Sequence, residues 1–168
     1  LDIKDFFENV NHELLLKALK VHVSEKWILM YIQRWLESSV QLSDGTLLLT
    51  SGKGTPQGGV ISPLLANLYL HYCVDKWLLI HYPSVKMVRY ADDIVISCRT
   101  QQGAIQLLTK LNQRLADCGL TVHSEKTKLV YCKKEGRRLT GYPVQFDFLG
   151  FSFRPIMMKL KKGGSFLQ

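Results

Sequence analysis

The chain has 168 residues, of which 46% are hydrophobic and 21% are charged, and its formal net charge is +8. This length is enough for one domain with a packed core, and the composition is ordinary for a globular protein. No stretch approaches the roughly 18 uninterrupted apolar residues of a membrane span, which argues against a membrane protein. The four cysteines form no CxxC pair and no cluster with histidine at zinc spacing, and three of them lie within apolar or helical stretches, so we expect buried free thiols.

The N-terminal part of the chain predicts one strand and two helices. It opens on LDIKDFF, of which residues 1–4 are the start of a predicted strand. Because there is no initiator methionine and no targeting segment, we expect a piece of a longer protein. Asn11 is a suitable N-cap for a first helix, whose apolar positions are Leu14, Leu15, Ala18 and Leu19. Ser24 opens a second helix, whose expected apolar face is Ile28, Tyr31, Ile32 and Trp35.

A hairpin, a glycine-rich loop and a long helix are predicted next. Residues 39–50 form the expected hairpin around Asp44-Gly45, a strong turn signal. The loop SGKGTPQGGVISP follows at residues 51–63, and its glycines allow a ligand to approach the backbone closely. It ends on Ser62-Pro63, a cap followed by proline at the first helical position. The run LLANLYLHYCVDKWLLIHY is apolar on most sides and predicts a deeply packed helix of about five turns.

Two adjacent carboxylates, Asp92 and Asp93, lie between two strand-forming runs in KMVRYADDIVISC. Ionised aspartates repel each other and favour turns, so a tight hairpin tip is their expected place. Taken alone, an ordinary acidic turn explains them equally well. A helix is predicted from about Thr100 to Cys118, with Gly119 as its C-cap and with apolar positions Ile105, Leu108, Leu111 and Leu115. Strands are expected at LTVH, KLVYC and FDFLGFSF.

The basic residues are concentrated near the C-terminus. Residues 1–125 carry 12 Lys and Arg against 12 Asp and Glu, whereas residues 126–168 carry 10 basic residues against two acidic ones. Aromatic residues are interleaved with this basic stretch, which suits nucleic acid because phosphates meet charge and bases meet rings. A solvated basic tail beside a β-hairpin is the alternative interpretation.

Without the glycine-rich loop and its neighbours, the predicted order is strand, helix, two-stranded hairpin, helix, strand. This order predicts an α+β fold, a ferredoxin-like (split βαβ) domain with inserted helices and a C-terminal β-hairpin. In that topology the first strand lies beside the central hairpin, so Asp2 is expected beside Asp92 and Asp93. Carboxylate oxygens suit Mg²⁺, and a pair of such ions about 3.5–4 Å apart promotes phosphoryl transfer.

Five motifs resemble, in order and spacing, the palm of reverse transcriptases: LDIKDFF, GTPQGGVISPLLANLYL, RYADD, GLTVHSEKTK and FDFLGF. The likeness is greatest to bacterial group II intron-encoded reverse transcriptases, also called maturases. It implies a polymerase palm, with a catalytic core over about residues 1–132 and a basic loop and primer-grip-like hairpin over about residues 133–168. It also implies that fingers, thumb or maturase, and endonuclease regions lie outside this segment, and that the isolated segment has little or no activity.

The resemblance assigns the catalytic roles residue by residue. Asp2 and Asp92 resemble the metal-binding catalytic aspartates of these enzymes, and the Ile3 carbonyl would complete a metal shell. Asp93 resembles the neighbouring aspartate, which assists the site as a further catalytic and metal-binding group. Lys126 resembles a lysine that neutralises or protonates the leaving pyrophosphate, with Lys128 or a plain surface lysine as alternatives.

The resemblance also assigns residues that contact the nucleotide and the primer. Phe7 lies where these enzymes place an aromatic gate that excludes a 2′-hydroxyl group, which favours deoxynucleotides. One of Phe6 and Phe7 is expected in the core. The implied nucleotide-binding residues are Phe6, Phe7, Pro56, Gln57 and Gly58. The implied primer- or nucleic-acid-binding residues are Tyr90, Phe148, Leu149, Gly150, Lys133, Lys134, Arg137 and Arg138.

The activity implied by the resemblance is RNA-directed DNA polymerisation. Two Mg²⁺ ions, or Mn²⁺ in their place, would assist a primer 3′-hydroxyl group that attacks a dNTP, with intron RNA as template and a DNA target as primer. The resemblance implies the cytoplasm and nucleoid of a bacterium and no membrane partner, and it leaves the oligomeric state open. Three alternatives remain: a retron or diversity-generating reverse transcriptase, a mainly RNA-binding splicing maturase, and a nucleotide cyclase, whose GG[DE][DE]F hairpin differs from RYADDI.

Overall fold

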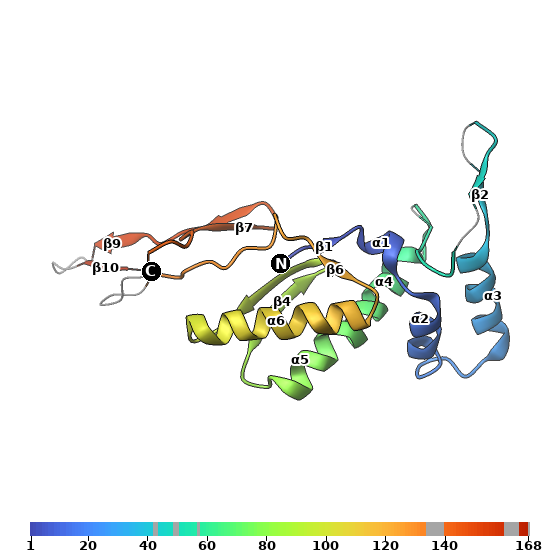
Figure 1. Ribbon diagram of the computed structural model, residues 1–168, viewed down its shortest axis with the longest axis horizontal. Coiled ribbons are helices and arrows are strands. Elements are labelled where there is room, and N and C mark those ends of the chain that lie inside the picture. Colours follow the sequence, from blue (N-terminus) through green and yellow to red (C-terminus); the bar gives the residue numbers. More distant parts are fainter. Residues whose placement is uncertain (42–43, 49–50, 57, 134–139, 160–164, 168) are drawn as a thin grey trace. The chain divides into compact units, whose positions relative to one another are not determined.

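The computed structural model describes residues 1–41, 44–48, 51–56, 58–133, 140–159 and 165–167 (Figure 1). The chain divides into two compact units, Leu1–His123 and Ser124–Gln168. We call them the first and second unit. The first unit combines helices with short strands, and the described part of the second consists of strands and loops.

Four strands of the first unit converge near the chain's first residues. These are β1 (Ile3–Lys4), β4 (Lys86–Tyr90), β5 (Asp93–Ser97) and β6 (Thr121–Val122). Strands β4 and β5 pair antiparallel, and β1 pairs antiparallel with β6. On the other side of β1, Leu1 and Ile94 exchange two backbone hydrogen bonds of 2.7 and 3.1 Å. Such a reciprocal exchange is typical of antiparallel neighbours, so the first residues of the chain lie between β5 and β6.

The helices of the first unit enclose one hydrophobic core. Their bounds are α1 (Phe6–Asn9), α2 (His12–Leu19), α3 (Lys26–Glu37), α4 (Ser62–Leu70), the π-helix η1 (His71–Asp75), α5 (Lys76–His81) and α6 (Gln101–Asp117). The predicted long helix is present as α4, η1 and α5, which follow one another without a break (Figure 1). Leu70 and Val74 on this helix are fully buried, and α6 packs against η1 and β6.

Local signals in the sequence determine several helix ends. The predicted cap at Asn11 is confirmed, since its Oδ1 accepts from the Leu14 nitrogen at 2.9 Å. Thr100 caps α6 in the same way, and Gly119 follows that helix with a φ of 71° that glycine adopts without strain. Ser62 is not the expected cap but the first residue of α4, and its hydroxyl donates to the Pro56 carbonyl at 2.7 Å.

Two predicted apolar faces are partly wrong. In α3, Ile32 and Leu36 are buried, whereas Tyr31 and Trp35 are 47% and 51% exposed. The reason is that α3 packs against α2, which covers only the side of α3 that carries Ile32 and Leu36. In α6, Leu107, Leu111 and Leu115 are buried and Ile105 is exposed, a shift of the buried stripe around the helix.

The predicted hairpin of residues 39–50 is confirmed by the pairing of β2 (Val40–Gln41) with β3 (Leu47–Leu48). At its tip, Asp44 accepts a hydrogen bond from the Thr46 nitrogen at 2.9 Å, as aspartate often does in turns.

Arg114 on α6 donates hydrogen bonds to two backbone carbonyls of the π-helix η1, which we also call the π-turn. Its Nε donates to the Cys73 carbonyl at 3.1 Å, and a terminal nitrogen donates to the Tyr72 carbonyl at 3.2 Å. Nearby, the buried Tyr69 hydroxyl donates to the Cys118 carbonyl at 2.5 Å. These contacts join the long helix to α6 through backbone groups.

The described part of the second unit contains two β-hairpins. Strand β7 (Phe146–Phe148) pairs with β8 (Phe151–Phe153), and β9 (Met157–Lys159) pairs with β10 (Ser165–Leu167). Between β7 and β8, Leu149 and Gly150 have φ angles of 52° and 80°, as both central residues of a type I′ turn require. The strand predicted at KLVYC is wrong, because residues 128–132 form no strand; Tyr131 donates its backbone N–H to the Pro143 carbonyl at 2.9 Å.

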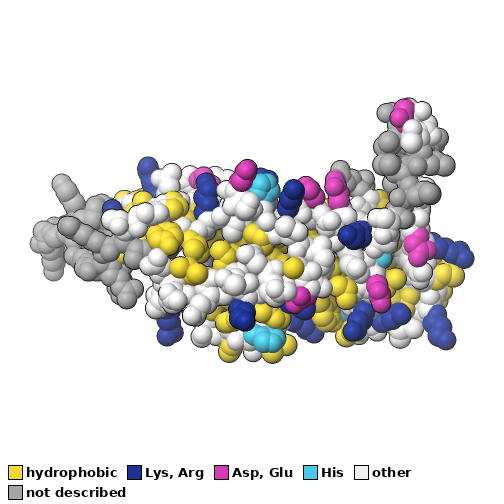
Figure 2. Space-filling view, in the orientation of Figure 1, with side chains coloured by type: hydrophobic (Ala, Val, Ile, Leu, Met, Phe, Trp, Pro, Cys, Tyr) yellow, Lys and Arg dark blue, Asp and Glu magenta, His cyan; other side chains and the backbone are white. Residues whose placement is uncertain are grey.

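The surface and the cysteines match an ordinary globular chain. Cys73 and Cys118 are buried free thiols as predicted, whereas the thiol of Cys132 is exposed. Hydrophobic side chains also reach the surface among charged ones, as Figure 2 shows for one face, and this is normal for folded proteins. Within the described residues, no helix has the length and apolar character needed to cross a membrane.

Candidate active site

The first strand brings Asp2 to the acidic hairpin. The Asp2 carbonyl accepts from the His123 nitrogen at 2.9 Å, and the preceding Leu1 pairs with Ile94. Because Leu1 and Ile94 are antiparallel partners, the same register places Asp2 opposite Asp93.

The turn between β4 and β5 carries the other acid. Ala91 and Asp92 form the tip, and Tyr90 pairs with Asp93 across it, so the predicted acidic hairpin tip is confirmed. Ala91 has a φ of 51°, in the left-handed region that non-glycine residues adopt infrequently and mostly at turns and functional sites. Asp92 is half-buried and Asp93 is exposed. The tip thus presents two carboxylates in different surroundings.

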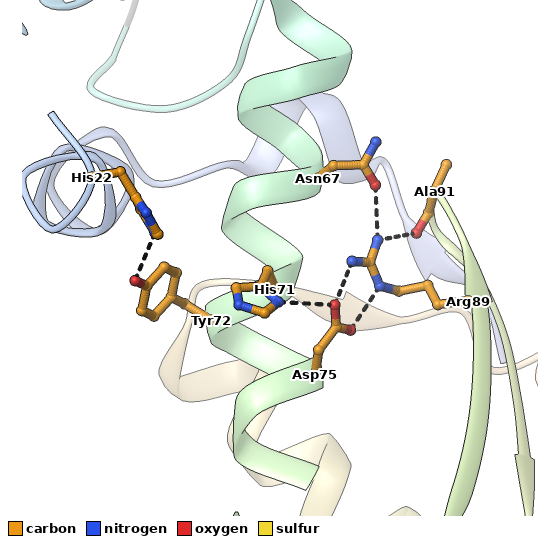
Figure 3. Close-up of polar contacts among 7 residues, drawn as sticks. All are labelled: His22, Asn67, His71, Tyr72, Asp75, Arg89 and Ala91. Carbon is orange, nitrogen blue, oxygen red and sulfur yellow. Dashed lines mark hydrogen bonds and ion pairs between the residues drawn. The ribbon is translucent and has the colours of Figure 1, made fainter. Parts of the chain in front are cut away.

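Arg89 connects this turn to the long helix, a contact that the sequence did not reveal (Figure 3). Its guanidinium group binds both carboxylate oxygens of Asp75, at 2.6 and 2.8 Å. It also donates to the Asn67 side-chain oxygen and to the Ala91 carbonyl, each at 2.9 Å. The available signal was Asp75, the single acidic residue of the long helix.

The glycine-rich loop is bound directly to the segment that carries Phe7. The Phe7 carbonyl accepts from the Thr55 nitrogen at 2.8 Å, and the Gly54 nitrogen donates to the Val10 carbonyl at 2.8 Å. His12, which is buried, donates from Nε2 to the Gly54 carbonyl at 2.6 Å. The sequence predicted a role for this loop, but not that His12 and Thr55 would attach it.

The two phenylalanines have different surroundings. Phe6 is 4% exposed and belongs to the core, which confirms that one of the pair is a core residue. Phe7 is half-buried, and its ring contacts that of Phe6 with 5.3 Å between the centroids. Phe7 therefore keeps a partly accessible ring beside the glycine-rich loop.

The remaining loop residues form a tight bend. The Pro56 carbonyl accepts from the Gly59 nitrogen at 3.2 Å and from the Ser62 hydroxyl at 2.7 Å. Gly58 is exposed, with a φ of 82°. Gln57 lies outside the described residues.

The other predicted binding residues are mostly in the second unit. Tyr90, in the first unit, is 65% exposed beside the acidic turn. Among the predicted residues of the second unit, Phe148 is half-buried, and the following are exposed: Lys126, Lys128, Lys133, Leu149 and Gly150. Lys134, Arg137 and Arg138 lie outside the described residues. The placement of Lys126 and of the primer-grip-like turn near Asp2 stays a prediction.

The acidic residues supply the oxygen ligands that Mg²⁺ prefers, with additional ligands required. Among the described residues, no group of three or more His, Cys, Asp or Glu side chains could hold a metal ion. Mg²⁺, however, is usually held by one or two carboxylates together with water and substrate phosphates, and it prefers oxygen ligands. Asp2, Asp92 and Asp93, with the Ile3 carbonyl, supply only oxygen donors. The three-carboxylate metal site stays a prediction.

Comparison with known proteins places the chain in a family. Residues 1–153 match the family described as reverse transcriptase (RNA-dependent DNA polymerase). The match covers most of the chain, so the chain belongs to the reverse transcriptase family. The mixture of helices and sheet fits the palm fold of such a polymerase.

Three relatives show which reverse transcriptases are similar. The Putative COX1/OXI3 intron 1 protein of Saccharomyces cerevisiae is 24% identical, over 86% of this chain and 23% of its own length. Protein YkfC of Escherichia coli is 26% identical, over 76% and 42%. The Group II intron-encoded protein LtrA of Lactococcus lactis is 35% identical, over 46% and 12%. The resemblance to group II intron-encoded proteins is thereby confirmed, and the chain spans less than half the length of these relatives.

Proposed function

We propose that this chain is the catalytic palm of a group II intron-encoded reverse transcriptase. It would support the addition of dNTPs to a primer 3′-hydroxyl group on an RNA template, and so intron mobility and splicing. The main support is the exchange of backbone hydrogen bonds between Leu1 and Ile94, which brings Asp2 to the turn that carries Asp92. Membership in the reverse transcriptase family and the likeness to intron-encoded relatives support the same function.

The palm would have the ferredoxin-like order β4–β5–β1–β6. Support comes from the antiparallel pairs β4–β5 and β1–β6, together with the Leu1–Ile94 exchange that links β1 to β5. In a split βαβ sheet, the first strand lies between the third and fourth strands in the same way. This order would keep the acidic residues on neighbouring strands while the helices support one face.

The acidic residues would bind and orient the reacting groups. Asp2, Asp92 and Asp93, with the Ile3 carbonyl, would hold two Mg²⁺ ions, or Mn²⁺ in their place. When bound, these ions supply activation of the attacking hydroxyl group and stabilisation of charge on the leaving group. The chain's own contribution is positioning and a fixed electrostatic environment, which supply most of the catalysis in phosphoryl transfer.

The nucleotide would bind between Phe7 and the glycine-rich loop. The Thr55–Phe7 backbone hydrogen bond holds the two segments together, and the Phe7 ring is only half-buried. A ring beneath the sugar would exclude a 2′-hydroxyl group and so select deoxynucleotides. Pro56, Gln57 and Gly58 would bound the other side of the nucleotide. A Phe7→Leu variant, which keeps an apolar side chain, should incorporate ribonucleotides more readily than the parent protein.

The second unit would provide a surface for the template and primer. Its described lysines at positions 126, 128 and 133 are exposed, and residues 126–168 carry 10 basic residues against two acidic ones. Such charge suits phosphates, and the exposed rings of Phe151 and Phe153 suit stacking with bases. Lys126 would act near the leaving pyrophosphate, and Phe148-Leu149-Gly150 would brace the primer end.

The test is primer extension by an Asp92→Ala variant of the protein that contains this chain. We expect extension to be abolished while the affinity for RNA stays close to that of the parent, because Asp92 contributes to catalysis and not to phosphate binding. Asp44→Ala is the matched control, since Asp44 also occupies a hairpin tip, and it should extend primers normally. Normal extension by Asp92→Ala would refute the proposed function.

A further inference from the structure

The turn that carries Asp92 is held by the side chain of Arg89, which is not one of the predicted catalytic residues. The Ala91 carbonyl, which is part of the peptide bond to Asp92, accepts from a terminal nitrogen of Arg89 at 2.9 Å. Ala91 has a φ of 51°, so the turn adopts a conformation that alanine on its own disfavours. A backbone conformation of this kind persists only where the surroundings impose it.

Arg89 is itself held by two residues of the long helix, Asp75 and Asn67. Both oxygens of Asp75 accept from its guanidinium group, at 2.6 and 2.8 Å, and Asn67 accepts at 2.9 Å. The side chains of Arg89 and Asp75 are only 12% and 24% exposed. A bidentate, charge-assisted pair in such surroundings is stronger and more directional than an exposed ion pair. On the side of Asp75 that faces away from Arg89, the Nδ1 atom of His71 lies 3.4 Å from the Asp75 carboxylate (Figure 3).

The π-turn places both acceptors on one face of the long helix. Two turns of α-helix take about seven residues, and a π-turn adds about one more. Asn67 lies in α4 and Asp75, eight residues later, is the last residue of η1, and their side chains meet at the same guanidinium group. Leu70 and Val74, between them, are fully buried. The acceptors are therefore mounted on a part of the helix that the core holds firmly.

We propose that Arg89, held by Asp75 and Asn67, is a positioning residue that fixes the Ala91–Asp92 peptide and thereby the Asp92 carboxylate. This inference rests on the proposed function, because it takes Asp92 as the group that must be positioned. Groups that orient a metal ligand typically change metal affinity or activity by about 10–100-fold when they are removed. A displacement of about 1 Å at the reacting atoms can lower the reaction rate by about 100-fold.

The decisive variant is Arg89→Lys in the protein that contains this chain. Lysine keeps the positive charge, but as a point charge it cannot reproduce the guanidinium fork between Asp75, Asn67 and the Ala91 carbonyl. We expect kcat of primer extension and affinity for Mn²⁺, measured by electron paramagnetic resonance, to fall by about 10–100-fold, with RNA affinity unchanged. Asn67→Ala removes one acceptor without leaving a charge unpaired, and it should cause a smaller loss in the same direction. Arg99→Lys, at the opposite end of the hairpin, is the matched control and should behave as the parent.

A charge swap separates positioning from stability. Arg89→Asp combined with Asp75→Arg can restore the ion pair, but a carboxylate at position 89 cannot donate to the Ala91 carbonyl. We expect the swap to recover more of the thermal unfolding midpoint than of the Mn²⁺ affinity. Parent-like Mn²⁺ affinity and kcat in either Arg89→Lys or the swap would overturn the proposal.

Asp92→Ala, measured alongside, separates this inference from the proposed function. If Asp92→Ala keeps extension and Mn²⁺ binding, the proposed function fails, and the positioning role fails with it. If Asp92→Ala loses both while Arg89→Lys keeps both, only the positioning role fails.

Discussion

Gly54→Ala should destabilise the first unit more than a matched substitution at Gly119. Both glycines have a positive φ, of 86° and 71°. A Cβ atom at Gly54 would lie 3.2 Å from the Glu8 carbonyl oxygen and 3.5 Å from that of Phe7, whereas a Cβ atom at Gly119 would meet nothing within 4 Å. The two substitutions therefore share the backbone strain, and only Gly54→Ala also separates two packed segments.

The expected magnitudes follow from these contacts. The left-handed conformation costs a non-glycine residue roughly 1–2 kcal/mol, which applies to both variants. At Gly54 the added atom also pushes the loop from α1 and weakens its hydrogen bonds to the Phe7 and Val10 carbonyls. Each such bond contributes about 0.5–1.5 kcal/mol. Gly54→Ala should therefore lower the free energy of unfolding by roughly 2–4 kcal/mol, and Gly119→Ala by roughly 1–2 kcal/mol.

Urea unfolding followed by circular dichroism measures both values, provided that the two variants share one m value. Primer extension gives a second readout, since a loosened loop should also weaken the discrimination against ribonucleotides at Phe7. Equal losses of stability in the two variants would refute the close contact between the loop and α1. Unchanged nucleotide discrimination in Gly54→Ala would refute the coupling of that loop to Phe7.

Three further substitutions or modifications test individual contacts. Arg114→Met should lower the thermal unfolding midpoint, because the Tyr72 and Cys73 carbonyls of η1 each lose a hydrogen bond from the guanidinium group. Each hydrogen bond to a charged group contributes about 1.5–3 kcal/mol, and an unchanged midpoint would contradict this role. Asn11→Ala should cost about 1 kcal/mol of unfolding free energy, whereas Asn11→Ser should retain most of it, because serine also caps helices. Burial raises the pKa of the Cys98 thiol, so at pH 8 it should be alkylated more slowly than the exposed Cys132, with the difference shrinking at higher pH; mass spectrometry that finds equal rates at pH 8 would contradict this.

Features with a local cause could be predicted from the sequence. Asn11 caps α2 through a side chain three residues from its partner, and Gly119 ends α6 through its own backbone freedom. The acidic turn at Asp92 follows from repulsion between neighbouring charges. These causes act over a few residues, so they are visible in the sequence itself.

Features that depend on distant partners could not be predicted in the same way. Tyr31 and Trp35 have the spacing of a buried stripe, but α2 covers the side of α3 that carries Ile32 and Leu36. The Arg89–Asp75 pair depends on a π-turn, whose extra residue changes which helix positions face the hairpin. Helical periodicity assumes a constant turn, so it could not reveal that contact.

The position of β1 also has a consequence for synthesis on the ribosome. This strand is only two residues long, yet its neighbours are β5, which starts at Asp93, and β6, which starts at Thr121. At translation rates of about 5–20 residues per second, these partners emerge roughly 5–25 s after it. During that interval Asp2 has no neighbouring strand, so Asp2, Asp92 and Asp93 cannot come together before β5 has emerged. The chemistry proposed for this site would thus be unavailable until most of the first unit has been made.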